Sequence, residues 1–197
     1  KRVRQTAKKA SSADLDEEPE SYSKAQNAQD LVKDRNNPPL NAPITNFFAD
    51  AVYETVAPYY KQRTGQTIDF VLLNFGGIRS DLPKGDITMG SAYNLMPFEN
   101  EMVVLTMSGE KVQELADYLI KHRLPHPLSK QVQLQITHDG KITHFTIHGK
   151  PFNPKATYLV ATSDYLMYGG DAMYFFSNPL KTDMLDYKVR NVLIDYF

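Results

Sequence analysis

Cysteine and tryptophan are both absent from the 197 residues of the chain. Without cysteine there is no disulfide, no thiolate zinc site, no iron–sulfur cluster and no cysteine nucleophile. An excess of one charge is also lacking, because 22 Lys and Arg offset 23 Asp and Glu to a formal net charge of −1. A general nucleic-acid binder needs a basic surplus, and a membrane-spanning helix needs an apolar run of ~20 residues. We therefore expect neither a nucleic-acid partner nor a transmembrane segment.

Sequence motifs that mark self-sufficient catalytic centres are missing as well. There is no Gly-x-Ser-x-Gly elbow, no Gly-x-Gly-x-x-Gly fingerprint and no P-loop. His122 and His126 are four residues apart, but the prolines on both sides of His126 break the helix that would align them. Asp164 and Asp171 could form an acid–base pair, although a turn cap and a loop contact explain them equally well. We predict no catalytic residue and no metal ligand in this chain.

The composition is otherwise that of a globular protein, with 42% hydrophobic and 23% charged residues, including twelve Tyr and ten Phe. Residues 1–20 differ, because half of them are charged and none is aromatic. Such a segment buries too little apolar surface to offset the entropy of ordering. The sequence predicts a charged, disordered N-terminal segment over 1–20 and a single domain over 21–197, with its folded part beginning between residues 21 and 42.

Hydrophobic spacing predicts interleaved helices and strands. Helical spacing runs from Phe47 to a stop at Gly65, recurs after a capping Ser108, and returns over residues 189–196. Strands are expected at 67–73, 102–107, 132–137, 142–147 and 157–162, with an Asp139-Gly140 turn between the third and fourth. Because hairpins interrupt the alternation, we predict an α+β fold with a mixed sheet and packed helices.

Two glycine-containing loops follow predicted buried strands. One is Asn74-Phe75-Gly76-Gly77-Ile78-Arg79, and the other runs from Tyr165 to Gly169-Gly170-Asp171. Paired glycines allow positive φ and close approach of the backbone to a ligand, although they also make plain turns. Between them, Met96-Pro97-Phe98-Glu99-Asn100 carries an aromatic ring in a loop. Spacing alone leaves both a ligand pocket and ordinary turns open.

These segments, together with Ser108-Gly109 and Asn46-Phe47-Phe48-Ala49-Asp50-Ala51, occur in the order and approximate spacing of a known family. Over about residues 40–197 the sequence resembles the C-terminal, substrate-specificity domain of the 5′-nucleotidases, a family that includes UDP-sugar hydrolases and 2′,3′-cyclic phosphodiesterases. The resemblance implies the fold of that domain. It also implies a nucleotide site, whose members would be Asn74, Gly76, Gly77, Arg79, Phe98, Tyr165, Gly169, Gly170 and Asp171.

The resemblance gives several of these side chains a role. Phe98 and Tyr165 would clamp the nucleobase between their rings, and Asn74 would lie near the nucleoside. Arg79 would reach toward ribose and phosphate, and Asp171 would accept hydrogen bonds from ribose hydroxyls. Tyr165 stands where Phe is commoner, and its ring should still stack on a base.

The sequence departs from the family pattern at two points. The family brings an arginine from the segment before its first helix, where this chain has Leu40-Asn41-Ala42-Pro43, and Arg35 is the nearest substitute. Free nucleosides are therefore expected to bind almost as well as their monophosphates. The catalytic metallophosphoesterase half, with its Asp, Asn and His ligands to two metal ions, is also missing.

The resemblance therefore implies the nucleotide- or nucleoside-binding half of a 5′-nucleotidase-like phosphohydrolase that takes part in nucleotide catabolism. This half would hold no cofactor of its own, and a separately encoded metallophosphoesterase would carry the divalent metals. By resemblance, its location would be periplasmic or at the cell surface. Two alternatives stay open: a stand-alone, non-catalytic nucleoside- or nucleotide-binding module, and a degenerate structural domain kept as an interaction surface.

Overall fold

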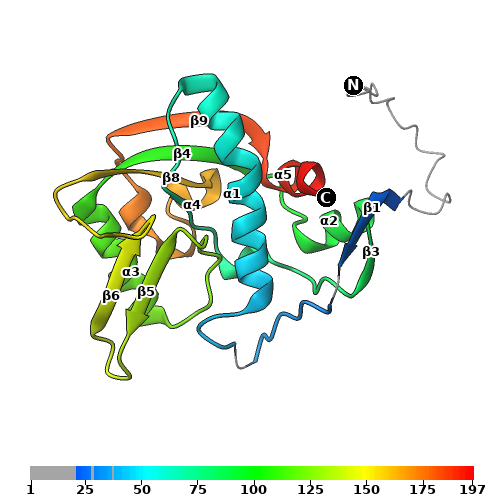
Figure 1. Ribbon diagram of the computed structural model, residues 1–197, viewed down its shortest axis with the longest axis horizontal. Helices are drawn as coiled ribbons and strands as arrows, with labels where there is room; N and C mark the ends of the chain where they lie inside the picture. The colour runs from blue at the N-terminus through cyan, green and yellow to red at the C-terminus, as the bar shows by residue number, and fades with distance from the viewer. Residues whose placement is uncertain (1–20, 28, 37) are drawn as a thin grey trace.

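The computed structural model describes residues 21–27, 29–36 and 38–197, so the predicted N-terminal segment, 1–20, lies outside the described residues. At its centre is a four-stranded sheet in the order β2-β8-β4-β9, built from Phe70–Val71, Thr157–Ser163, Glu101–Ser108 and Lys181–Lys188 (Figure 1). β2 and β8 are parallel and the other neighbours are antiparallel. The predicted α+β fold with a mixed sheet is confirmed.

Helices cover both faces of this sheet. α1 (Pro43–Thr64) and α5 (Val189–Tyr196) share one hydrophobic cluster with Val104 of β4. α3 (Gly109–His122) shares the other cluster with Val103 and Leu105. Successive side chains of a strand point to opposite faces, so a strand buried on both faces is apolar throughout. This double burial explains the apolar run from Met102 to Leu105 in the sequence of β4.

The helix ends follow local rules that the sequence carries. α1 begins four residues before the predicted Phe47, because Pro43 fits the first helical turn, where no partner for its missing N–H is needed. It ends as predicted at Gly65, whose φ of 75° lets its N–H bond the carbonyl of Lys61 at 2.8 Å. Ser108 caps α3 by accepting a hydrogen bond from the N–H of Lys111 at 3.3 Å.

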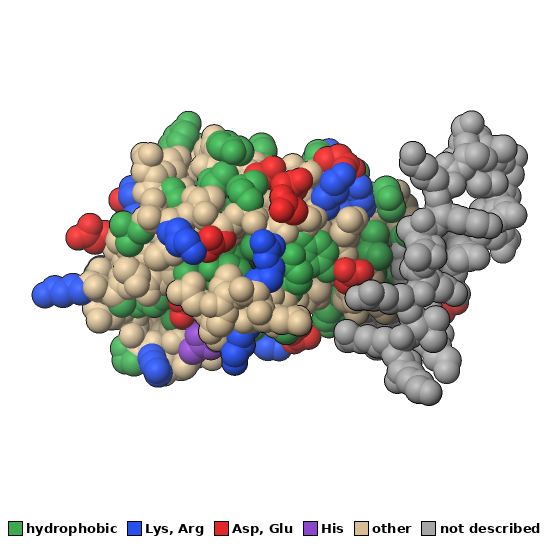
Figure 2. Space-filling model, turned by 90° about the horizontal axis from the view of Figure 1, so that it is seen from above, with side chains coloured by type: hydrophobic (Ala, Val, Ile, Leu, Met, Phe, Trp, Pro, Cys, Tyr) green, Lys and Arg blue, Asp and Glu red, His purple; other side chains and the backbone are tan. Residues whose placement is uncertain are grey.

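Two smaller antiparallel sheets flank the central one. β5 (Val132–Ile136), β6 (Ile142–Ile147) and β7 (Lys150–Pro151) form the first, and its hairpin turns at Gly140, where φ is 85°. β1 (Ser21–Asn27) and β3 (Gly85–Thr88) form the second. Acidic and basic side chains mix on the face that Figure 2 displays, in keeping with the near-zero net charge. Within the described ranges, no helix combines the length and apolarity needed to cross a bilayer.

The structure differs from the sequence prediction near the candidate loops. The strand expected over 67–73 is reduced to Phe70–Val71. Beyond it, the N–H of Leu72 still bonds Ala161 of β8 at 3.1 Å, whereas the N–H of Leu73 bonds the carbonyl of Pro127 at 2.9 Å. Two short helices were not predicted, α2 (Met89–Leu95) and the single turn α4 (Asp164–Met167). α2 starts with a reciprocal capping box between Thr88 and Ser91, in which Ser takes the place of the usual Glu or Gln, so the signal in the sequence is weak.

Candidate functional site

Three segments that are far apart in the sequence line one cleft with a volume of about 260 Å³. The volume is just below the range of typical small-ligand pockets, about 300–1,000 Å³. Seven of the nine predicted site residues line it, and Gly169 and Gly170 belong to the adjoining loop. The lining residues are Asn74, Gly76, Gly77, Arg79, Phe98, Asn100, Tyr165 and Asp171.

Strand direction explains why these segments meet. β2 and β8 are parallel neighbours with Phe70 opposite Val160, so the loops that follow them leave from the same edge of the sheet. β4 is antiparallel to β8 and begins at that edge, with Met102 opposite Ser163. The loop before β4, residues 96–100, therefore arrives where the other two loops depart.

Asp171, an exposed residue that lines the cleft, is held by three hydrogen bonds. Its Oδ2 accepts from Asn74 Nδ2 at 2.9 Å, and its Oδ1 accepts from the Tyr165 hydroxyl at 2.8 Å. Its main-chain carbonyl accepts from the Tyr118 hydroxyl at 2.7 Å. The backbone of Asp171 has a φ of 52°, a left-handed conformation that Asp adopts more readily than most residues. The hydrogen bond to Asp171 raises the pKa of Tyr165, so its hydroxyl remains a donor at neutral pH.

The two predicted base-stacking rings are both solvent-exposed. Phe98 is 39% exposed and Tyr165 is 42% exposed, although large aromatic side chains are usually buried. Phe98 precedes β4, and Tyr165 lies in α4 directly after β8. Both rings line the same cleft, and their role as a base clamp stays a prediction.

Two of the predicted site glycines leave room for a neighbouring side chain of the site. A Cβ on Gly77 would lie 2.9 Å from Asn74 Oδ1, and a Cβ on Gly170 would lie 2.4 Å from a ring carbon of Tyr165. Gly169 adopts a positive φ of 91°, whereas the other three predicted site glycines do not. Any side chain at Gly170 would therefore displace the Tyr165 ring.

Three basic side chains meet at the loop from Asn74 to Arg79: Arg79 lines the cleft, whereas Lys33 and Arg35 bind main-chain carbonyls of the loop. The guanidinium of Arg79 lies 5.8 Å from the centroid of the Phe98 ring. Arg35 donates a hydrogen bond to the carbonyl of Arg79, so the arginine that the sequence suggested as a substitute lies at this loop. Lys33 Nζ donates one hydrogen bond to the carbonyl of Phe75, at 2.8 Å, and another to the carbonyl of Ile78. Burial, together with repulsion from Arg35 and Arg79, lowers the pKa of Lys33 to about 8.

The buried side chain of His126 binds the backbone of the loop that follows Asn74. It is 7% exposed, and its Nδ1 accepts a hydrogen bond from the N–H of Phe75 at 3.2 Å, which places the proton of the neutral ring on Nε2. Burial lowers the pKa of His126 to about 4, against the opposing effect of Asp171. In the described part of the chain, no three His, Asp or Glu side chains cluster closely enough to hold a metal ion.

Sequence reasoning missed Asn100, His126 and Lys33 as members of this region. Asn100 lines the cleft, and its place two residues after Phe98 in the same quoted segment could have identified it. The spacing of His126 from His122 resembles only metal-ligand spacing, which the prolines on both sides of His126 argue against. No local signal marks Lys33, which reaches the loop from 42 positions away.

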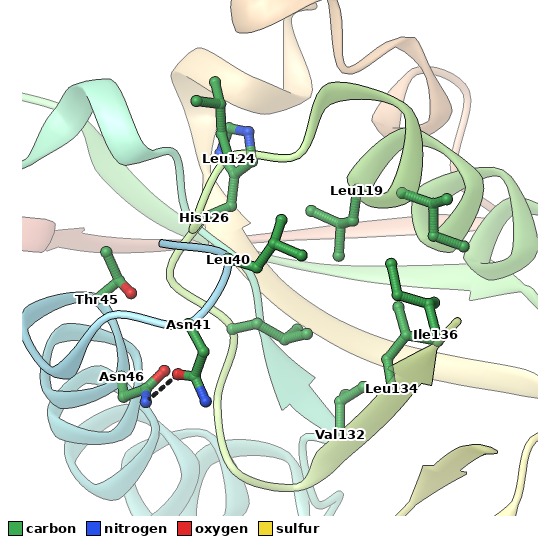
Figure 3. A pocket seen from close by; sticks show the side chains of 12 residues that line it. Leu40, Asn41, Thr45, Asn46, Leu119, Leu124, His126, Val132, Leu134 and Ile136 are labelled. Atoms are coloured by element: carbon green, nitrogen blue, oxygen red, sulfur yellow. Dashed lines mark hydrogen bonds between the residues drawn. The ribbon is translucent and has the colours of Figure 1, made fainter. Parts of the chain in front are cut away.

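A second cavity, of about 250 Å³, lies between the start of α1, the end of α3 and β5. Figure 3 shows Leu40, Leu119 and Ile136 among the apolar side chains that surround it. None of the nine predicted site residues lines this cavity, and its lining includes no Lys, Arg, Asp or Glu. The cleft at Asn74 and Asp171 is therefore the better candidate for a polar ligand.

Known proteins match most of this chain. The family described as "5′-nucleotidase, C-terminal domain" matches residues 22–178. The protein UshA of Salmonella pullorum is 38% identical over 114 residues, which cover 55% of this chain and 20% of UshA. The apyrase of Tabanus yao is 27% identical over 177 residues, which cover 78% of this chain and 31% of the apyrase.

Solved structures share the fold. The 5′-nucleotidase precursor of Thermus thermophilus aligns with a TM-score of 0.71 and 19% identity, over 87% of this chain and 35% of that protein. The NAD nucleotidase of Haemophilus influenzae aligns with a TM-score of 0.65 and 20% identity, over 86% of this chain and 34% of that protein. The chain spans about a fifth of the length of the UshA proteins that it matches.

Proposed function

The chain belongs to the 5′-nucleotidase C-terminal domain family, and on that premise we propose that it binds a nucleoside or nucleotide as the substrate-holding part of a 5′-nucleotidase-type phosphohydrolase. One observation carries the proposal: the exposed rings of Phe98 and Tyr165 line the same cleft as the hydrogen-bonded pair Asn74 and Asp171. Flat apolar faces beside a polar pair suit the two parts of a nucleoside, its base and its sugar.

The proposed contacts follow from the chemistry of each side chain. The base stacks on Phe98 and Tyr165, and each stacking contact contributes roughly 1–3 kcal/mol. Each oxygen of Asp171 already accepts one hydrogen bond, from Asn74 or Tyr165. An ionised carboxylate has about four acceptor sites, so Asp171 retains capacity for ribose hydroxyls. Arg79 lies beside Phe98, where it extends the site toward the phosphate.

Hydrolysis in this proposal requires a metallophosphoesterase on a separate chain, whose two divalent ions activate water and stabilise the leaving oxygen. The residues described here bind and orient the base and the ribose. A periplasmic or cell-surface location is part of the proposal and rests on the family resemblance.

Calorimetric titration with adenosine tests the binding. Phe98→Ala removes one stacking face and should weaken binding by roughly 1–3 kcal/mol, or about 5- to 150-fold. Tyr168→Ala is the matched control, because Tyr168 is an aromatic residue with 79% exposure that does not line the cleft. Loss of affinity in both variants, or no binding of any nucleoside to the native chain, contradicts the proposal.

A second measurement separates substrate-holding from stand-alone binding. The isolated chain should release no phosphate from adenosine monophosphate, with or without added divalent metal. Addition of a metallophosphoesterase partner should then give hydrolysis that Phe98→Ala impairs. Binding without any effect on hydrolysis favours the stand-alone module, and absence of both favours the structural domain.

A further inference from the structure

The loop that carries Phe98 is hydrogen-bonded to the start of the C-terminal helix, α5. Arg190, in the first turn of α5, is 5% exposed. Its Nη1 donates to the main-chain carbonyl of Phe98 at 3.4 Å, and its Nη2 bonds the carboxylate of Glu99. The guanidinium also lies 4.2 Å from the centroid of the Tyr93 ring. One buried cation therefore contacts the loop on both its backbone and its side chain.

Neighbouring residues reinforce this attachment. Lys188 binds the other oxygen of Glu99, and the N–H of Val189 donates to the carbonyl of Asn100 at 2.9 Å. Lys188 and Arg190 hold the pKa of Glu99 down at about 2, so its carboxylate stays ionised except in strong acid. Three consecutive residues of the C-terminal segment thus hold three consecutive residues of the loop.

The ring of Phe98 has little packing of its own to fix its position. It is 39% exposed, and Arg79, the cation that lies over it, is itself exposed. The direction of the ring therefore depends on the backbone of residues 98–100. Arginine suits this task, because its planar fork bonds two acceptors at once while its face lies against an aromatic ring, which a lysine ammonium does not do.

We infer that Arg190 is a positioning residue for the proposed base clamp: by holding the Phe98 carbonyl and the Glu99 carboxylate, it keeps the Phe98 ring in the cleft. This inference rests on the proposed function and adds to it a determinant in α5, outside the cleft. It predicts that loosening Arg190 frees the ring before any ligand is present.

The absence of tryptophan from the chain allows a direct test. F98W introduces a single tryptophan at the clamp position, which is excited selectively at wavelengths that the twelve Tyr do not absorb. Its nanosecond anisotropy decay reports segmental motion of the loop. F98W/R190M should gain a fast depolarising component that F98W lacks, and F98W/R190K should give an intermediate decay. The control is F98W/R63M, because Arg63 lies against the Tyr59 ring in a similar way but contacts Leu185 and not this loop.

Two further variants keep the test decisive. Should R190M prevent folding, F98W/E99Q removes the charge of the exposed partner and should also mobilise the fluorophore. In adenosine titrations, F98A/R190M should bind no more weakly than F98A alone, because Arg190 acts on binding only through the Phe98 ring. If Arg190 acted on overall stability instead, its loss would weaken adenosine binding further in the double variant.

The outcomes separate the two proposals. Unchanged decay in both F98W/R190M and F98W/E99Q overturns the inference, whatever the ligand results. Increased motion in a protein whose native form binds no nucleoside supports the tether and overturns the nucleotide proposal. Additive losses in F98A/R190M show that Arg190 acts on overall stability, which also overturns the positioning role.

Discussion

Asn74 donates a hydrogen bond from Nδ2 to Oδ2 of Asp171 at 2.9 Å, across 97 positions of the chain. The bond joins the loop after β2 to the loop after β8, two strands that are parallel neighbours in the sheet. Asp171 also holds Tyr165, so one carboxylate fixes both the amide and one of the aromatic rings. A change at Asp171 should therefore affect recognition of the sugar and of the base together.

Asp171→Asn should reduce the discrimination between ribose and deoxyribose. The substitution keeps the size of the side chain but removes charge-assisted acceptance from hydroxyls, which is about twice as strong as a neutral hydrogen bond. The ratio of affinities for adenosine and 2′-deoxyadenosine, measured by calorimetry, should move toward one. Asp186→Asn is the matched control, because Asp186 has a similar φ of 51° outside the cleft. An unchanged ratio would show that Asp171 does not contact the 2′-hydroxyl of the ribose.

Arg35→Ala should weaken binding of adenosine monophosphate while leaving adenosine unaffected. The sequence predicts nearly equal affinity for the two, because Leu40-Asn41-Ala42-Pro43 lacks the arginine of the family. The structure suggests a different outcome to test, because Arg35 bonds the main-chain carbonyl of Arg79 and so brings a second guanidinium close to a residue that lines the cleft. Loss of one charged contact to phosphate should reduce monophosphate affinity roughly tenfold or more.

Ionic strength provides the accompanying measurement. Contacts between exposed charges weaken as salt screens them, so monophosphate affinity should fall with added salt and adenosine affinity should not. Arg63→Ala, on α1, is the control for loss of a positive charge elsewhere. Equal affinities for the nucleoside and its monophosphate at low salt would restore the expectation from the sequence.

Gly170→Ala should impair nucleoside binding with little effect on folding. A Cβ at this position would lie 2.4 to 2.6 Å from three atoms of the Tyr165 ring, so the ring must move out of its place. Because Tyr165 is 42% exposed, it can move without opening the core. Gly90→Ala, within α2, meets only the Thr88 hydroxyl at 3.4 Å and serves as the control. Native-like adenosine affinity in Gly170→Ala would exclude Tyr165 from the binding site.

The parts of the fold that the sequence predicted are those with local causes. The apolar run of β4, the Ser108 cap and the Gly65 stop each act within a few residues, and the structure has all three. The sequence missed α2, in which Gly90 and Asn94 dilute a weak helical pattern. The pairing of Leu73 with Pro127, just beyond β2, joins residues far apart in the sequence, which no local pattern encodes.

The candidate site likewise has a part that the sequence predicted and a part that it did not. The resemblance named the loops, and strand order then brought seven of the nine named residues to one cleft. The supports behind those loops were invisible in the sequence, because Lys33, His126 and Arg190 each contact main-chain atoms of distant residues, and Arg190 also bonds the Glu99 carboxylate. Main-chain acceptors and donors carry no residue identity, so spacing cannot reveal such contacts.

His126 should make the protein lose stability in mild acid. Its pKa is about 4 in the folded chain, where burial disfavours the charged ring, against an ordinary value of 6.5. Between these two values the unfolded chain binds a proton that the folded chain does not, so protonation draws the equilibrium toward unfolding. This contribution to stability is complete above about pH 6.5 and is lost progressively as the pH falls toward 4. The gap between these two pKa values corresponds to a loss of about 3 kcal/mol in the free energy of unfolding.

Urea unfolding at about pH 7 and about pH 4 measures this contribution as the difference between the two free energies of unfolding. His126→Asn keeps a neutral acceptor for the N–H of Phe75, so it should fold at neutral pH and lose about 3 kcal/mol less than the native chain on acidification. His126→Leu also lacks the titration but leaves that N–H unbonded, so it should already be less stable at neutral pH, by about 1–3 kcal/mol. His144→Asn is the control, because His144 is exposed on β6. Should His126→Asn lose as much stability in acid as the native chain does, His126 is not the group that titrates. Carboxylates of the folded chain, rather than this histidine, would then account for the loss of stability in acid.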